Sequence, residues 1–99
     1  MIRGTTPTHI FKLPIHTSEI CKVRITYRQS GKTVLEKTEQ DVTMDGDTIS
    51  YQLTQEESLT FGIANAELQV KVLTNSGSVM ASNIIKLSIG EILNTEVLV

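Results

Sequence analysis

Three side chains in the first quarter of the 99-residue sequence could do chemistry: His9, His16 and Cys21. A cysteine beside a histidine base is a nucleophilic pair, and both residue types bind zinc. A zinc site normally needs four ligands at suitable spacing, however, and the sequence contains no CxxC or HxxxH pair. We therefore expect Cys21 to be a small buried residue of the core and His16 to be solvated in a loop.

A second candidate is Asp41-x-Thr43-x-Asp45-Gly46-Asp47, which places oxygen-bearing side chains at alternate positions and a glycine at the sixth, as a calcium loop does. Its twelfth position is Gln52 instead of a bidentate Glu, and the flanking residues alternate as strands do. Asp-Gly is also the dipeptide of a type I′ turn. We favour a hairpin with Asp45-Gly46 as its loop and Val42 opposite Ile49, and expect neither a metal nor a cofactor.

A basic stripe on the outer face of one expected strand is a third candidate. It consists of Lys22, Arg24 and Arg28, with Lys12 or Lys71 nearby. Glutamates on neighbouring strands are expected to neutralise it: Glu36, Glu39 and Glu67. The net charge of −2 and the absence of aromatic residues from this face argue against nucleic acid as a partner.

No catalytic signature is present. The sequence lacks a Gly-rich phosphate loop, a Gly-x-Ser-x-Gly elbow and a convincing pair of acidic residues. We assign no catalytic residue and do not expect an enzyme. A small cytosolic enzyme would need a pocket that joins His9 and His16 to acidic residues.

The elements that must position these side chains are strands. Apolar residues recur with period two between turns at Ser30-Gly31, Asp45-Gly46 and Asn75-Ser76-Gly77. This pattern predicts one domain over residues 1–99, a small antiparallel Ig-like β-sandwich of about seven strands. Thr54-Gln-Glu-Glu57 has the form of a capping box, so residues 55–60 are expected to form one helical turn, with Leu59 and Phe61 closing the end of the sandwich.

Details of the strands follow from the alternation. The strand over residues 20–29 should direct Cys21, Val23, Ile25 and Tyr27 inward. The last long run should place Val79, Ala81, Ile85, Leu87 and Ile89 on one side. Pro14 suggests an edge position for the strand over residues 8–15. In residues 32–38, adjacent Val34 and Leu35 leave the register open, and we expect an outer strand.

Cysteine content and hydropathy indicate the cellular compartment in which the protein is expected. The only cysteine excludes an intrachain disulfide and favours a reducing environment. The opening MIRGTTPTHIF lacks the basic and apolar regions of a signal peptide, and the apolar runs are too short to cross a bilayer. We expect no membrane as a partner.

The last segment is unusually apolar for a frayed end of a domain. Its apolar residues are Ile92, Leu93, Val97, Leu98 and Val99. Two interpretations remain open: they dock on their own sandwich or form a last edge strand, or they add to a neighbouring subunit. These five residues are the candidate interface.

The run MIRGTTPTHIFKLP, with Val23-Arg-Ile-Thr-Tyr27, Leu53-Thr-Gln-Glu-Glu57 and Leu68-Gln-Val-Lys-Val-Leu73, resembles small structural proteins of phages and prophages of Gram-positive bacteria. It is more distantly similar to the Ig-like amino-terminal domains of their baseplate or receptor-binding proteins. The resemblance implies a virion component of the tail, baseplate or neck, assembled in the bacterial cytoplasm, that acts through contacts with other virion proteins or with itself as a homo-oligomer. The alternative is a carbohydrate- or host-surface-binding domain, which would need an exposed aromatic platform or a metal.

Overall fold

The computed structural model describes all 99 residues, and most of the regular secondary structure is β-strand. The elements in chain order are β1 (Thr8–Lys12), a 3-10 turn (Thr17–Glu19), β2 (Ile20–Gln29), β3 (Lys32–Thr38), β4 (Thr43–Asp45), β5 (Thr48–Gln52), α1 (Gln55–Leu59), β6 (Ala66–Thr74), β7 (Val79–Ala81) and β8 (Ile85–Leu87).

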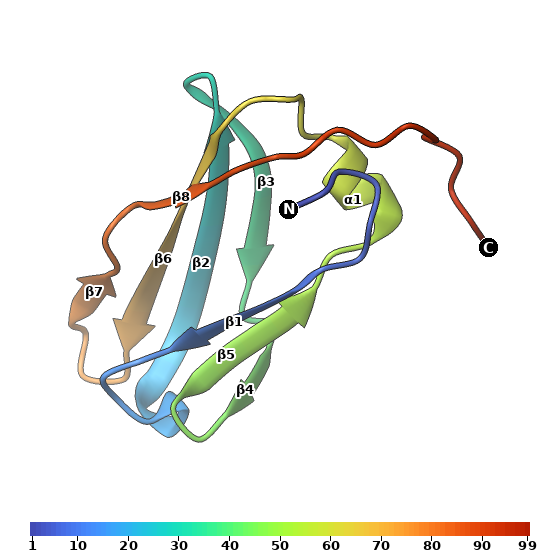
Figure 1. Cartoon of the computed structure of the whole chain (residues 1–99). Helices are drawn as coiled ribbons and strands as arrows, with labels where there is room; N and C mark the ends of the chain where they lie inside the picture. Colours follow the sequence, from blue (N-terminus) through green and yellow to red (C-terminus); the bar gives the residue numbers. More distant parts are fainter.

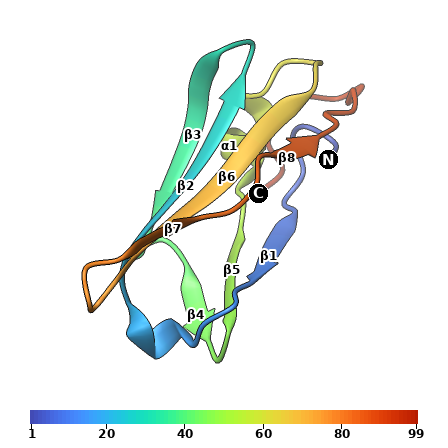
Figure 2. The ribbon, with the colours of Figure 1, turned by 90° about the vertical axis from the view of Figure 1, so that its left-hand side faces the viewer.

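Two antiparallel sheets face each other (Figures 1 and 2). One has the strand order β1-β5-β4, and the other has the order β3-β2-β6-β7, with β8 pairing at the opposite end of β6. The prediction of a small antiparallel all-β sandwich is confirmed. The strands number eight because the last predicted run divides into β7 and β8 around Ser82, whose Oγ accepts a hydrogen bond from the Val70 N–H. Both β1 and β3 are edge strands, as predicted.

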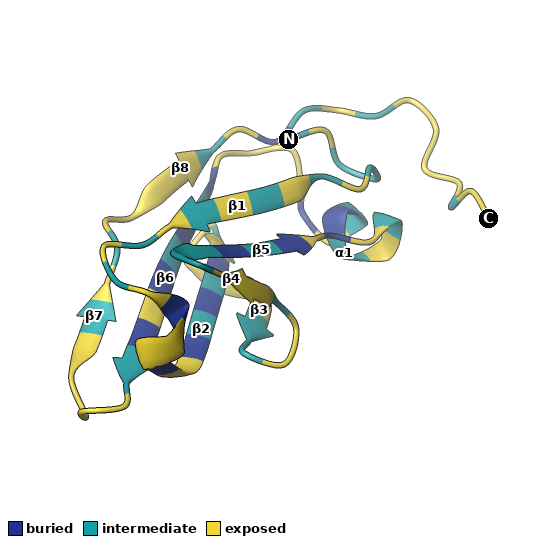
Figure 3. Ribbon diagram, turned by 90° about the horizontal axis from the view of Figure 1, so that it is seen from below, coloured by how far each residue is buried: buried dark blue, intermediate teal, exposed yellow.

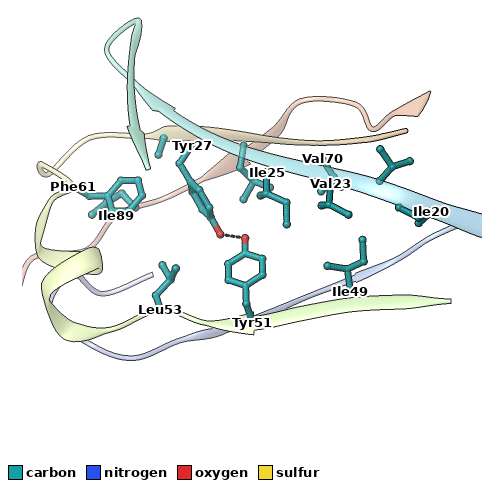
Figure 4. Packing of buried hydrophobic residues seen from close by; sticks show 13 residues of the cluster. Ile20, Val23, Ile25, Tyr27, Ile49, Tyr51, Leu53, Phe61, Val70 and Ile89 are labelled. Atoms are coloured by element: carbon teal, nitrogen blue, oxygen red, sulfur yellow. Dashed lines mark hydrogen bonds between the residues drawn. The ribbon is translucent and has the colours of Figure 1, made fainter. Parts of the chain in front are cut away.

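The core lies between the sheets and contains thirteen buried apolar residues. Period-two alternation supplies most of them: Val23, Ile25 and Tyr27 from β2, and Leu68, Val70 and Val72 from β6, face Ile49, Tyr51 and Leu53. Figure 4 shows Tyr27 and Tyr51 meeting across this space, and Figure 3 shows dark-blue buried positions alternating along β2, β5 and β6. Burial of these side chains is the main source of stability.

The predicted helical turn forms as α1. The Thr54 side chain accepts a hydrogen bond from the Glu57 N–H, and the Glu57 side chain accepts one from the Thr54 N–H, which is the predicted capping box. Phe61 is fully buried and Leu59 half-buried, so both close this end of the sandwich. Ser58 is also buried, and its hydroxyl donates to the Thr5 carbonyl.

The β2–β3 hairpin shows why adjacent Val34 and Leu35 could not be assigned to one face. Pairing shifts from Tyr27–Leu35 to Arg28–Thr33, so Val34 is the extra residue of a β-bulge. A bulge allows both neighbours to pack against the core, and both do. Gln29 pairs with Lys32, which leaves Ser30-Gly31 as the predicted two-residue turn.

The register expected for the Asp-Gly hairpin is wrong by one position on each side. Asp45 pairs with Thr48, so the loop is Gly46-Asp47 and Met44, not Val42, lies opposite Ile49. Gly46 alone has a positive φ, +58°, as in a type II′ turn with glycine first. The Thr17 N–H and hydroxyl both donate to the Gly46 carbonyl, so a contact from distant sequence fixes this turn.

Two inward-facing assignments are also wrong. A bulge between Ile20 and Lys22 shifts the alternation, so Ile20 is buried and Cys21 is exposed. In β7, Met80 packs against the core while Val79 and Ala81 are exposed, because Met80 pairs with the inward-facing Val72. Residues directly opposite each other in a sheet share a face.

Candidate interface

The segment 91–99 leaves the sandwich beside α1 and carries the least covered apolar side chains of the molecule (Figure 1). Leu93 is 98% exposed and Leu98 is 70% exposed, and Val99 is also exposed. Ile92 and Val97 are half-buried. The first interpretation holds only in part: a last edge strand does not form, and the segment docks partly on its own sandwich. Addition to a neighbouring subunit stays a prediction.

Two contacts position this segment. At its start, the Gly90 N–H donates to the Met1 carbonyl and the Gly90 carbonyl accepts from the Arg3 N–H. Further on, the amide of Gln55 on α1 holds both backbone groups of Leu98: Nε2 donates to the carbonyl at 2.7 Å and Oε1 accepts from the N–H at 2.8 Å. The segment is therefore held beside α1 by its backbone at Leu98, with the side chains of Leu93, Leu98 and Val99 left in water.

The total surface of the chain is large for its mass. A monomeric protein of 10.9 kDa is expected to expose about 5,600 Å². This chain exposes 6107 Å². Leu93, Leu98 and Val99 contribute apolar area to this exposed surface. Contiguous apolar patches on soluble proteins mark interaction sites.

A second feature lies inside the sandwich. The Tyr27 hydroxyl is hydrogen-bonded to His9 Nδ1 on one side and to the Tyr51 hydroxyl on the other. Burial lowers the pKa of His9 below its ordinary value, raises that of Tyr51 to about 12 and raises that of Tyr27 further, the last helped by the bond to Tyr51. These hydroxyls stay protonated at neutral pH, so the three side chains form a neutral polar chain that joins the two sheets.

The other candidate residues do not come together. His16 caps the 3-10 turn and contacts Ser18. His9 is half-buried on β1 and bonded to Tyr27, and Cys21 lies on the outside of β2 near the Thr74 carbonyl. None of the four surface hollows is lined by a histidine. No group of three or more His, Cys, Asp or Glu side chains is close enough to hold a metal ion, including the Asp41–Asp47 segment.

The basic stripe is largely neutralised by the glutamates named for that role. Arg24 Nη1 lies 2.7 Å from Glu39 and its Nε lies 3.9 Å from Glu36, and Arg28 lies 3.0 Å from Glu67. Hydrogen bonds from backbone N–H groups and from Arg24 lower the pKa of Glu39, so it stays charged. Lys22 and Lys71 have no carboxylate within 4.0 Å, and two isolated lysines are a weak electrostatic site.

No aromatic platform exists on the surface. Tyr27, Tyr51 and Phe61 are buried, and Phe11 is half-buried and stacks against Tyr51. A sugar ring would therefore find no exposed aromatic face on which to stack.

Comparison with known proteins finds nothing similar: no family model, no curated protein and no solved structure matches this chain. None of its helices is long and apolar enough to span a membrane. Fold and site together define a small β-sandwich whose most distinctive surface is an extended apolar segment. The sequence pointed to the five apolar residues of that segment but not to Gln55, because a glutamine that pairs with a backbone 43 residues away leaves no local signal.

Proposed function

We propose that this chain is a non-enzymatic structural or assembly module of a phage virion, in the tail, baseplate or neck, and that it acts through protein–protein contacts made by residues 91–99. The observation that carries the contact site is the exposure of Leu93, Leu98 and Val99 on a segment held in place by its backbone. Burial of each such side chain by a partner contributes about 1.5–3 kcal/mol. The virion context rests on the sequence resemblance.

Order in the segment supports this role. A partner that binds a segment already fixed along α1 loses less conformational entropy than one that binds a free tail. Assembly in a bacterial cytoplasm is in keeping with the single free cysteine. The alternative of glycan binding gains no support, since all four aromatic side chains are buried or half-buried.

The direct test is the composition of phage particles purified from the host after prophage induction. Mass spectrometry should detect the chain in these particles. A folded variant with Leu93→Asp and Leu98→Asp should be depleted from them. Ile63→Asp is the matched control, because Ile63 is also exposed but lies outside the segment. Particles that lack the wild-type chain, or that incorporate the double variant as well as the control, would contradict the proposal.

A further inference from the structure

An apolar groove opens between the two sheets at the end of the molecule away from residues 91–99. Its volume is about 230 Å³, and its apolar lining comes from Leu13 and Ile15 after β1, Val70 and Val72 of β6, and Met80 of β7. Val70 and Val72 belong to the core, so the groove is an opening into the core. It exists because β1 ends at Lys12 and β7 has only three residues, so no strand closes this side of the sandwich.

The edge of β7 beside this groove has free backbone groups. Ser82 N–H donates to the Val70 carbonyl, and hydrogen bonds in an antiparallel ladder recur at every second residue. Val79 and Ala81 therefore occupy the positions without bonds to β6, and their N–H and C=O groups point away from it. Since β7 has no other neighbour, this edge can accept a further strand.

The segment 91–99 presents matching groups. Because one amide of Gln55 binds both the N–H and the C=O of Leu98, these two groups point to the same side, as they do in a β-strand. The backbone groups of Val97 and Val99 consequently point to the opposite side, where they have no hydrogen-bond partner. The contact with Gln55 thus occupies the backbone groups of Leu98 and leaves those of Val97 and Val99 free to pair with another strand.

We infer that Val97–Val99 of one copy of this chain adds as an antiparallel strand to the β7 edge of a second copy. Val97 and Val99 then pair with Ala81 and Val79, and Leu98 lies opposite the inward-facing Met80, over the groove. This rests on the proposed function and names the partner. Charge also fits: Lys12 at the groove is 81% exposed with its nearest carboxylate 4.0 Å away, and Glu96, next to Val97, is in no ion pair.

The groove is filled by another copy and not by the chain's own segment. The strand that leads to residues 91–99 is β8, which pairs with Ala66–Leu68, whereas β7 pairs with Lys71–Leu73 at the other end of β6. Figures 1 and 3 show the segment and β7 at opposite ends of the molecule. The bonds from Gln55 to Leu98 hold the segment at the α1 end.

The first test is molar mass by light scattering over a wide range of concentration. The full chain should form oligomers. Ala81→Pro removes the free N–H of the β7 edge without removing a bond to β6, and it should raise the dissociation constant at least about tenfold. Ile10→Pro is the matched control, because Ile10 is exposed on the edge strand β1 and does not line the groove. The Ile10→Pro variant should therefore still form oligomers.

The second test identifies the contact by disulfide formation. In a Cys21→Ser background, chains with Ala81→Cys are mixed with chains that carry Val97→Cys, so that a mixed disulfide can form only between copies. Rapid formation of this dimer is expected because paired strands bring Cα atoms within disulfide range. Thr33→Cys on β3 replaces Ala81→Cys as the control and should not cross-link. This measurement needs no substitution that risks the fold of β7.

The outcomes separate the two proposals. One set of results would overturn the pairing with β7 and leave the apolar segment as the contact site. In that case the oligomers disappear with Val97→Asp and persist with Ala81→Pro, and the mixed disulfide does not form. The pairing with β7 would also be overturned if the chain is monomeric at every concentration and forms no mixed disulfide. The presence of the chain in phage particles would then still support the proposed function through a different partner.

Discussion

Replacing Tyr27 by phenylalanine is expected to cost more stability than the same change at Tyr51, although each removes one hydroxyl. The Tyr27 hydroxyl is the middle of the chain that runs from His9 to Tyr51. Tyr27→Phe removes two hydrogen bonds, leaving Tyr51 without a partner in the core and half-buried His9 without its bond to the second sheet. Tyr51→Phe removes one and leaves Tyr27 still bonded to His9.

The magnitudes follow from burial. Tyr27 is 0% exposed and Tyr51 is 6% exposed, so water does not readily replace the lost partner. A buried hydrogen bond contributes about 1 kcal/mol and a group left unsatisfied costs about 1–3 kcal/mol. We expect the free energy of unfolding to fall by about 2–3 kcal/mol for Tyr27→Phe and about 1 kcal/mol for Tyr51→Phe. The corresponding losses in Tm are about 12 °C and about 5 °C.

Urea denaturation followed by circular dichroism, on both single variants and the double variant, measures these values. The double variant loses no bond beyond those lost in Tyr27→Phe and leaves no Tyr51 hydroxyl unpaired, so it should cost at least about 1 kcal/mol less than the sum of the single changes. Equal losses for the two single variants, or additivity within about 0.3 kcal/mol, would refute the idea that Tyr27 bridges the two sheets.

Three further predictions concern stability. Because burial lowers the pKa of His9 in the folded chain, protonation of His9 favours unfolding. The free energy of unfolding should therefore be fully present above pH 6.5 and fall as the pH drops through 6.5 toward the lower pKa of the folded state. Chemical denaturation of His9→Gln should show no such loss between these pH values. Thr54→Ala should lower the free energy of unfolding by about 1 kcal/mol through loss of the cap, with Thr54→Ser close to wild type in the same measurement. Ser30→Asn should raise stability by about 0.5 kcal/mol, since Ser30 has φ +53° in a turn that favours asparagine before glycine; an unchanged Tm would contradict this.

Sequence patterns predicted the fold where local chemistry and tertiary packing agree. The capping box at Thr54 and the turn at Ser30-Gly31 are determined by neighbouring residues, and both form as predicted. The alternation in β6 is regular, so Leu68, Val70 and Val72 were correctly expected in the core.

The errors share one physical cause: distant contacts determine which side chains of a strand face the core. A bulge after Ile20 exchanged Cys21 for Ile20 in the core. The hydrogen bonds from Thr17 to the Gly46 carbonyl fixed a hairpin register that Asp-Gly alone does not specify. Because side chains alternate with period two, one extra residue reverses every assignment on one side of it.

The candidate site could be predicted only in part for the same reason. An excess of apolar residues after Gly90 is visible in the sequence. The groove is not, because it depends on where β1 and β7 stop relative to each other. The Gln55 contact with Leu98 likewise follows from the docking of α1, which no local pattern reports.

The positions of segment and groove determine the symmetry of any assembly that they form. They are different surfaces, so a contact between them is heterologous and leaves one free segment and one free groove on each pair of copies. Addition of further copies ends only where a ring closes; otherwise a filament grows. Because the two surfaces lie at opposite ends of a molecule whose extents are 46 × 30 × 17 Å, successive copies should follow one another head to tail. A two-fold symmetric dimer with both segments at one interface would therefore contradict the pairing of Val97–Val99 with β7.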